Sequence, residues 1–196
     1  MTRLTREESQ AQTRARLLTA AQKLFTKDGF RQTSVDRIAE AAGYSKGAFY
    51  SNFSGKDHIF LEMLETYGNA NLQTLLDLLT PPLEQEQVIQ HVCAWADDTA
   101  KSGNWAQLVV EFSTTNGKMK CNSSGQQEAI FRMHWRQLGE RLTMILGLSV
   151  LSPESLGALL YELTYAPAMS FMDNPGAGDL VRLALEGIIA KYHVRS

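Results

Sequence analysis

The sequence predicts an all-α protein, with a small N-terminal three-helix domain followed by a larger helical C-terminal domain. Apolar residues recur at the three- and four-residue spacing of helices along most of the 196-residue chain. Runs of alternating apolar and polar residues, internal repeats and low-complexity tracts are absent from the sequence. The hydrophobic content of 44% and the charged content of 20% are ordinary for a globular protein. We expect the two domains to span residues 1–56 and 57–196.

The first long helix is predicted over residues 12–28, and residues 1–11, which are polar and charged, are expected to fray. Gly29 follows the last helical residue and is expected to end the helix. The apolar residues expected on its inner face are Leu17, Ala21, Leu24 and Phe25.

Two short helices joined by a tight turn are predicted within the stretch TSVDRIAEAAGYSKGAFYSNFSGKD, residues 33–57. The pattern Thr33-x-x-Asp36 is typical of a capping box at the start of the first helix. Gly43 suits the left-handed position that ends this helix, and Ser45 can cap a second helix over residues 46–53. A turn this short predicts two helices that cross at a steep angle.

A long helix is predicted from Gly55 to Leu79, with Ser54-x-x-Asp57 as a second capping box and Pro81-Pro82 as its end. This helix begins in the first domain and ends in the second. Since no flexible Gly/Ser-rich linker separates the domains, we expect the helix to transmit movements of the body to the N-terminal domain.

Five further helices are predicted in the body, over residues 84–101, 104–114, 125–148, 153–172 and 177–193. The last two are apolar nearly all round, which indicates burial on more than one side. Either both lie deep in the core of one subunit, or their second side contacts a partner subunit; we favour the partner. The residues expected at such an interface are Leu156, Leu160, Leu163, Leu180, Ala184 and Ile188.

The short helix pair resembles the DNA-binding domain of TetR-family transcriptional repressors. The resemblance covers about residues 12–64 and is carried by Ile38-Ala39-Glu40-Ala41-Ala42-Gly43, by Ser45-Lys46-Gly47-Ala48-Phe49-Tyr50-Ser51-Asn52-Phe53 and by Lys56-Asp57. It implies a helix-turn-helix whose second helix enters the major groove of DNA, and a homodimer that pairs its last two helices in a four-helix bundle. Most relatives carry an aromatic residue or histidine where this chain has Asn52, so a DNA contact there is in doubt.

The distribution of charge fits a nucleic-acid partner. Residues 1–60 carry ten lysine and arginine side chains against six acidic ones, whereas residues 61–196 carry nine against fifteen. Arg3 and Arg6 either reach a DNA groove as an arm or belong to a solvated tail. The residues expected in the DNA-binding set are Thr33, Ser34, Tyr44, Ser45, Lys46, Gly47, Phe49, Tyr50 and Lys56.

Within this set the expected roles differ. Lys46 and Gly47 belong to the helix that approaches the bases, whereas the Tyr50 hydroxyl, Thr33 and Lys56 are expected to contact phosphates. Phe49 is expected to face the interior of its domain together with Phe53, four residues later.

Large rings gather in the middle helices of the body. From the rings alone, core packing is a better explanation than a ligand cavity; the family resemblance reverses this and favours a cavity for an apolar or aromatic effector. Glu111 and Glu162 either face such a cavity, where they would select cations, or lie on solvated helix faces. The residues expected to bind the ligand are Tyr67, Trp95, Trp105, Phe112, Phe131, Trp135 and Tyr165.

Enzymatic functions have no support in the sequence. The four histidines, His58, His91, His134 and His193, have no metal-ligand spacing, and no nucleophile elbow or phosphate loop occurs. We therefore expect neither a cofactor nor a metal, and no catalytic residue.

The two cysteines, Cys93 and Cys121, are too few for a disulfide scaffold. The longest apolar tract, residues 156–172, is interrupted by Glu162 and Pro167, so a membrane span is not expected. Because the N-terminus lacks the apolar core of a signal peptide, a cytoplasmic location is expected.

These observations together predict a homodimeric repressor that binds a palindromic DNA operator and is released by a small apolar or aromatic effector. An alternative interpretation is a DNA-binding dimer that acts without an effector.

Overall fold

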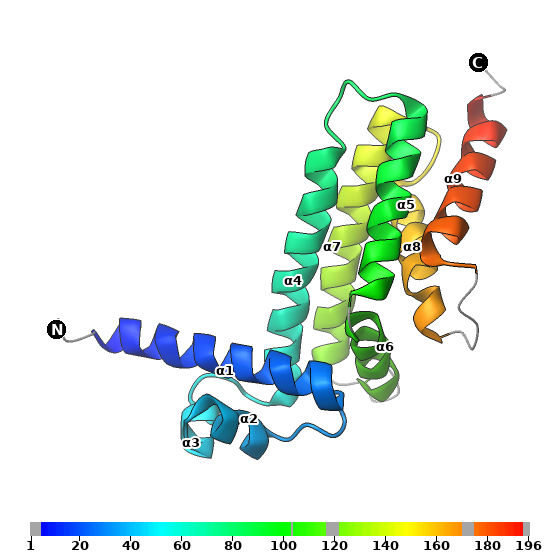
Figure 1. Ribbon diagram of the computed structural model, residues 1–196. Helices are drawn as coiled ribbons and strands as arrows, with labels where there is room; N and C mark the ends of the chain where they lie inside the picture. Colours follow the sequence, from blue (N-terminus) through cyan, green and yellow to red (C-terminus); the bar gives the residue numbers. More distant parts are fainter. Residues whose placement is uncertain (1–4, 103, 117–121, 170–174, 194–196) are drawn as a thin grey trace.

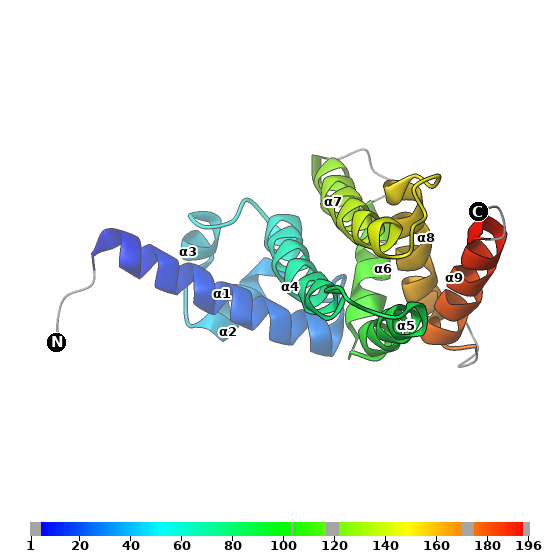
Figure 2. The same ribbon diagram turned by 90° about the horizontal axis from the view of Figure 1, so that it is seen from above.

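The protein is all-helical, as predicted, with a small N-terminal unit set at one end of a helical body (Figures 1 and 2). The computed structural model describes residues 5–102, 104–116, 122–169 and 175–193. Its helices are α1 (Arg6–Asp28), α2 (Val35–Ala42), α3 (Lys46–Tyr50), α4 (Lys56–Leu78), α5 (Gln85–Lys101), α6 (Trp105–Asn116), α7 (Asn122–Ile145), α8 (Pro153–Tyr165), the short 3-10 helix η1 (Ala166–Met169) and α9 (Ala177–His193). Helices α1 to α3 form the unit that we call the head, and α9 lies at the side of the body farthest from it.

Helix α1 starts six residues before the predicted position, so the expectation that residues 1–11 fray is wrong from Thr5 onward. Thr5 is the N-cap: its hydroxyl accepts a hydrogen bond from Glu8 N at 3.2 Å, and the Glu8 carboxylate accepts one from Thr5 N at 2.7 Å. This reciprocal pair satisfies two backbone donors that the first turn leaves unpaired. Arg6 is therefore a helical residue, whereas Arg3 lies outside the described residues.

Helices α2 and α3 form the predicted pair joined by a tight turn. Gly43 has φ 77° and ψ 28°, the left-handed conformation expected after α2, and its N–H bonds the carbonyls of Ala39 and Glu40. Ser45 caps α3 by accepting from Ala48 N, as predicted. The predicted capping box at Thr33 is wrong because the N-cap of α2 is Ser34, whose hydroxyl accepts from Arg37 N.

Helix α4 connects the head to the body without a break (Figure 1). Its ends lie within one residue of the predicted ones, but the second capping box is wrong: Gly55 is the N-cap and no side chain caps the helix. The Ser54 hydroxyl instead lies 3.3 Å from His58 Nδ1. The first half of α4 is buried against the head and the second half against the body.

Helix α8 ends earlier than predicted because of Pro167, which lacks the N–H that would continue the helix. The chain tightens into η1 after Tyr165 instead of running as one helix to residue 172. The backbones of α7 and α8 come unusually close: a Cβ on Gly157 would lie 1.9 Å from the carbonyl oxygen of Trp135, and one on Gly139 would lie 1.7 Å from that of Pro153. Glycine at both positions lets the two helices meet and fixes where Trp135 lies.

Two hydrophobic clusters fill the interior. The head cluster joins residues of α1 to α4 to Leu108, Val109 and Phe112 of α6, so α6 belongs to both the head and the body. The body cluster consists mainly of aliphatic side chains from α4, α5, α7, α8 and α9. Among the described residues, no helix is both long and apolar enough to cross a membrane.

Candidate functional site

Helix α3 presents a small polar surface to solvent. Ser45, Lys46 and Gly47 in its first turn are exposed, and the Tyr50 side chain is 51% exposed. A Cβ on Gly47 would meet only the Ser45 hydroxyl, at 3.7 Å, so nothing on the protein side requires glycine there. This turn can therefore approach another molecule closely, with a cation and hydroxyl groups around it.

Lys46 makes an ion pair within the head. Its Nζ lies 2.9 Å from Asp36 Oδ1 and 3.0 Å from Asp36 Oδ2, which joins the first turns of α2 and α3. The hydrogen bond to Asp36 and the charge of that carboxylate raise the pKa of Lys46. The lysine is therefore protonated at neutral pH, and because both side chains are exposed it can exchange Asp36 for an external anion.

Three residues of the predicted DNA-binding set do not present their side chains on this surface. Phe49 is fully buried in the head core. Thr33 is 1% exposed, and its hydroxyl donates to Gly29 O at 2.8 Å. Lys56 is half-buried and donates to Phe30 O at 2.7 Å, so its amine binds the backbone of the head.

Two further members of the predicted DNA-binding set, Ser34 and Tyr44, lie outside α3. Ser34 is exposed, with its hydroxyl used as the cap of α2, and Tyr44 is half-buried against the head cluster. Asn52 turns its amide back on its own helix, since Nδ2 donates to Ala48 O at 2.8 Å while Oδ1 is buried and has no partner among the described atoms. Asn52 is thus a structural residue of the end of α3.

A side chain that the sequence did not single out fixes the end of α3. Arg14 of α1 donates to the main-chain oxygen of Asn52 at 2.5 Å and forms a two-point ion pair with Glu62 of α4. Its guanidinium lies 4.1 Å from the centre of the Phe53 ring. Nothing in the sequence marks Arg14, because one arginine on the polar side of an amphipathic helix carries no positional signal.

A cavity of about 220 Å³ opens between α6, α7, α8 and η1. Three of its lining residues, Phe131, Trp135 and Tyr165, belong to the predicted ligand-binding set. The rings of Phe131 and Trp135 stack at 6.2 Å and 15°. Glu162, one of the two carboxylates considered for the cavity, also lines it. The other lining residues, which the sequence did not indicate, are Val109, Val110, Ser113, Thr114, Tyr161, Ala166 and Met169.

The other four predicted ligand residues lie elsewhere. Trp95 is 6% exposed and packs edge-on against Tyr161 in the body core. Phe112 is fully buried in the head cluster. Tyr67 and Trp105 line a separate groove between α1 and α4, where the Tyr67 hydroxyl donates to Gln22 Oε1 at 2.5 Å.

The polar groups of the cavity are few. Trp135 lines the cavity with part of its ring, but its Nε1 is buried and has no acceptor among the described residues. Burial raises the pKa of Tyr165 to about 12, so its hydroxyl stays neutral. Glu162 lines the cavity and is exposed, whereas Glu111 neither lines it nor lies on a solvated face: its carboxylate bonds the backbone of the head.

The predicted interface residues on α8 and α9 divide into two groups. Leu156 and Leu160 are 3% and 0% exposed, and they fill the core of the single subunit, so their expected place on an outer face is wrong. The outer faces carry Leu159, 41% exposed, and Leu183, 73% exposed, which the sequence did not single out. Leu163, Leu180, Ala184 and Ile188 are half-buried beside them.

The described residues offer little support for metal binding or for thiol chemistry. No group of three His, Cys, Asp or Glu side chains lies close enough together there to hold a metal ion. Burial raises the pKa of the Cys93 thiol, which disfavours the reactive thiolate, and Cys121 lies outside the described residues.

Comparison with known proteins gives matches of two kinds. The family described as bacterial regulatory proteins of the tetR family matches residues 17–63. The HTH-type transcriptional regulator AcrR of Shigella flexneri is 42% identical over 65 residues, which are 33% of this chain and 30% of that protein. The chain thus spans about a third of the length of this relative.

Solved structures extend the similarity to nearly the whole chain. A TetR-family transcriptional regulator from Streptomyces coelicolor has a TM-score of 0.67 at 18% identity, with 92% of this chain and 96% of that chain covered. FadR from Thermus thermophilus, solved in complex with lauroyl-CoA, has a TM-score of 0.66 at 22% identity, with coverage of 93% and 96%. At these identities the likeness shows a shared fold.

Proposed function

Because the chain belongs to the TetR family of bacterial regulatory proteins, we propose that it is a repressor that binds a palindromic operator as a homodimer and is released by a small apolar or aromatic effector. The family consists of transcription regulators and not of enzymes, in agreement with the lack of catalytic motifs in the sequence. The observation that carries the proposal is the exposed start of α3. Ser45, Lys46 and Gly47 face solvent there, and the space around Gly47 is open.

In this proposal α3 enters the major groove and the residues around it hold the head on the DNA backbone. Lys46 and Tyr50 are the side chains most able to reach DNA, since both are exposed and both extend from α3. Ser34 and Tyr44 flank them and contribute phosphate contacts. Thr33, Phe49 and Lys56 act indirectly, by fixing the shape of the head.

The homodimer is proposed to form through the outer faces of α8 and α9. These faces are apolar, and their exposure to water is unfavourable. They carry the exposed Leu159 and Leu183 and the half-buried Leu163, Ala184 and Ile188. Both helices lie on the side of the body away from the head, which leaves the two heads of a dimer free to bind DNA (Figure 2). Two-fold symmetry of the dimer then requires a palindromic operator.

The effector is proposed to occupy the cavity between α6, α7 and α8. Stacked rings and aliphatic side chains favour an apolar or aromatic compound. FadR of Thermus thermophilus, which shares this fold, was solved in complex with lauroyl-CoA, and this supports a small-molecule ligand for this chain. Residues 1–56 would form the DNA-binding domain and 57–196 the effector-binding and dimerisation domain, with α4 linking them.

The test uses DNA duplexes selected from a random pool by the purified protein, followed by a panel of aromatic, acyl and lipophilic cationic compounds. Binding of each compound is read from tryptophan fluorescence, and operator affinity is then measured with and without it. We expect a palindromic consensus and at least one compound that quenches tryptophan and weakens DNA binding. Failure to select any duplex would refute the proposal, whereas DNA binding that no compound alters would favour a dimer that acts without an effector.

A further inference from the structure

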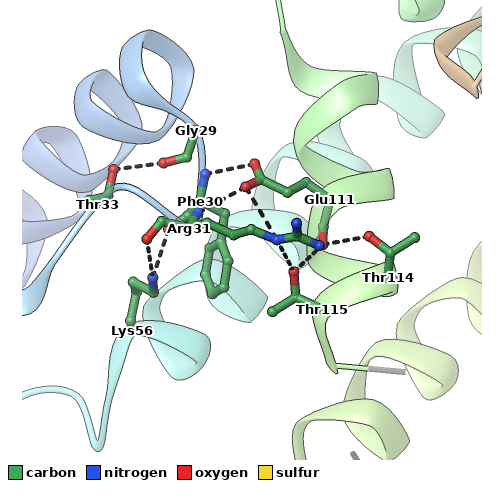
Figure 3. A network of polar contacts seen from close by, with 8 residues as sticks. All are labelled: Gly29, Phe30, Arg31, Thr33, Lys56, Glu111, Thr114 and Thr115. Atoms are coloured by element: carbon green, nitrogen blue, oxygen red, sulfur yellow. Dashed lines mark hydrogen bonds and ion pairs between the residues drawn. The ribbon is translucent and has the colours of Figure 1, made fainter. Parts of the chain in front are cut away.

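The segment that joins α1 to α2 is held from two sides by charged side chains of the helices around it (Figure 3). Glu111 of α6 accepts two hydrogen bonds from its backbone, from Phe30 N at 2.9 Å and from Arg31 N at 3.0 Å. Lys56 of α4 donates to Phe30 O at 2.7 Å. The same two residues are therefore fastened to α6 through their N–H groups and to α4 through a carbonyl.

The segment is shaped to receive the Glu111 carboxylate. Gly29 has φ 84°, and a Cβ at this position would lie 3.1 Å from Glu111 Oε2, so a side chain would be both strained and crowded. Arg31 adds a longer ion pair to Glu111 at 3.9 Å and donates from Nε to Thr115 Oγ1 at 2.9 Å. Hydrogen bonds from N–H groups to a carboxylate are shorter and stronger than neutral ones, so this contact resists displacement.

Helix α6 carries both this contact and one wall of the cavity. Val110 and Thr114, one turn apart, line the cavity, while Glu111 lies between them and points to the head. Phe112 anchors the same helix in the head cluster, with its ring 4.4 Å from that of Phe60. A displacement of α6 by a ligand would therefore move the partner of Phe30 and Arg31 directly.

We propose that Glu111 couples the cavity to the DNA-binding unit: a ligand that displaces α6 loosens its hydrogen bonds to Phe30 and Arg31 and so shifts α2 and α3 relative to the body. The inference rests on the proposed function and deepens it by adding a route separate from α4. Glu111 is a positioning residue, because it contacts neither ligand nor DNA. The ligand acts by its different affinity for the two positions of α6, and DNA affinity changes by the same factor.

Two variants test the contact, with a third as the matched control. Glu111→Gln keeps the size of the side chain, but its amide has only one oxygen and cannot accept both hydrogen bonds; Glu111→Ala removes both acceptors. Gln107→Ala changes an exposed residue of the same helix. We expect faster amide hydrogen exchange at Phe30 and Arg31 in both Glu111 variants, with exchange at these amides unchanged in Gln107→Ala.

The coupling itself is measured as the ratio of affinities for a selected duplex without and with saturating N-phenyl-1-naphthylamine, a neutral aromatic dye. Coupled sites usually give a factor of about 5–150, and we expect such a factor for the wild type and for Gln107→Ala. In both Glu111 variants it should fall to within about twofold of 1, while thermal melting stays cooperative. A merely structural role would lower the melting temperature without abolishing the effect of the dye.

Each contrary result has a distinct meaning. Glu111 variants that keep the wild-type coupling factor would overturn the inference and leave the proposed function intact. Loss of cooperative melting in both variants would also overturn it, because Glu111 would then be required for folding. A wild type that selects no duplex would refute the proposed function itself, and a wild-type DNA affinity that the dye does not change would remove the coupling that Glu111 is proposed to carry.

Discussion

The head and the body of this molecule are held together by different kinds of contact. The head core is aromatic: Phe60 lies 4.4 Å from Phe112, 5.2 Å from Phe30 and 5.6 Å from Phe25, measured between ring centres. The body core is mainly leucine, isoleucine and valine, with Trp95 and Tyr161 as its buried rings. Ring pairs prefer particular geometries, whereas aliphatic contacts are largely non-directional, so the head is the more narrowly specified of the two.

Polar contacts do not follow this division. Charged side chains bond the backbone of the head, where Arg14 binds Asn52 O and Lys56 binds Phe30 O, and also that of the body, where Arg141 binds Leu76 O and Leu79 O. The cavity lies in the body. In a regulator of the proposed kind, DNA recognition requires a head of fixed shape. A response to a ligand requires a body that can change its conformation.

The largest effect is expected where a charge enters the body core. Leu160→Glu places a carboxylate at a position that is 0% exposed. Burying a charge without a partner costs several kcal/mol, a large part of the 5–15 kcal/mol that usually stabilises a domain. We expect loss of the cooperative thermal transition, measured by circular dichroism.

Leu183→Glu is the matched control, because Leu183 is also a leucine on an apolar helix of the body but is 73% exposed. The subunit should remain folded, with a change in the free energy of unfolding within about 0.5 kcal/mol. Sedimentation should then show monomers if the outer faces of α8 and α9 form the dimer. A folded Leu183→Glu dimer would place the interface elsewhere, and a folded Leu160→Glu monomer would mean that Leu160 is not part of the core.

Helix ends could be predicted about equally well in head and body. Helices α2, α4, α5 and α9 begin and end within one residue of the prediction, because local signals such as Gly43 and Pro81-Pro82 act within a few residues. Helix α3 begins where Ser45 predicts but ends at Tyr50 instead of residue 53. The start of α1 was missed although its capping pair, Thr5 and Glu8, is equally local and could have been found. Local chemistry thus determines most of the helix ends.

The cavity and the interface could not be located in this way. Helical periodicity marks which residues are buried but not which neighbour covers them, so Phe112 and Trp95 were indistinguishable from Phe131 and Trp135. The contacts of Glu111 could not be predicted for the same reason. Its hydrogen bonds join residues 80 or more positions apart, and no pattern around it in the chain points to the head.

A smaller effect is expected from His134, a buried polar side chain of the body. The side chain is 1% exposed, its Nε2 lies 2.8 Å from Asn69 Oδ1, and burial lowers its pKa from 6.5 to about 4. Between these pH values the unfolded chain binds a proton that the folded chain does not. The free energy of unfolding should therefore fall as the pH drops from 6.5 to 4, by at most about 3 kcal/mol.

The comparison is between wild type and His134→Gln, unfolded by urea at several pH values. The variant is expected to be less stable near pH 7, because it loses the packing of the ring against Tyr161, but its stability should depend less on pH in this window. Equal pH dependence in the two proteins would show that His134 titrates normally in the folded state. The body would then tolerate charge at this position.

The smallest effect on folding is expected at Lys46, on the surface of the head. Lys46→Ala removes an exposed ion pair, which contributes little to stability in water, so the free energy of unfolding should hardly change. Affinity for a selected duplex should nevertheless fall. If Lys46 reads a base, the loss should be about 1–3 kcal/mol and concentrated at one base pair. If it binds phosphate, affinity should fall by the same factor for all duplex sequences, and the dependence of log affinity on log salt concentration should drop in slope by about one.

Asp36→Asn separates the two parts of the ion pair, because it keeps the Lys46 cation and removes the neighbouring carboxylate. This variant should bind DNA at least as tightly as wild type. Unchanged affinity in Lys46→Ala would remove Lys46 from the proposed interface, and a large loss of stability would show that the head depends on its surface as well as on its aromatic core.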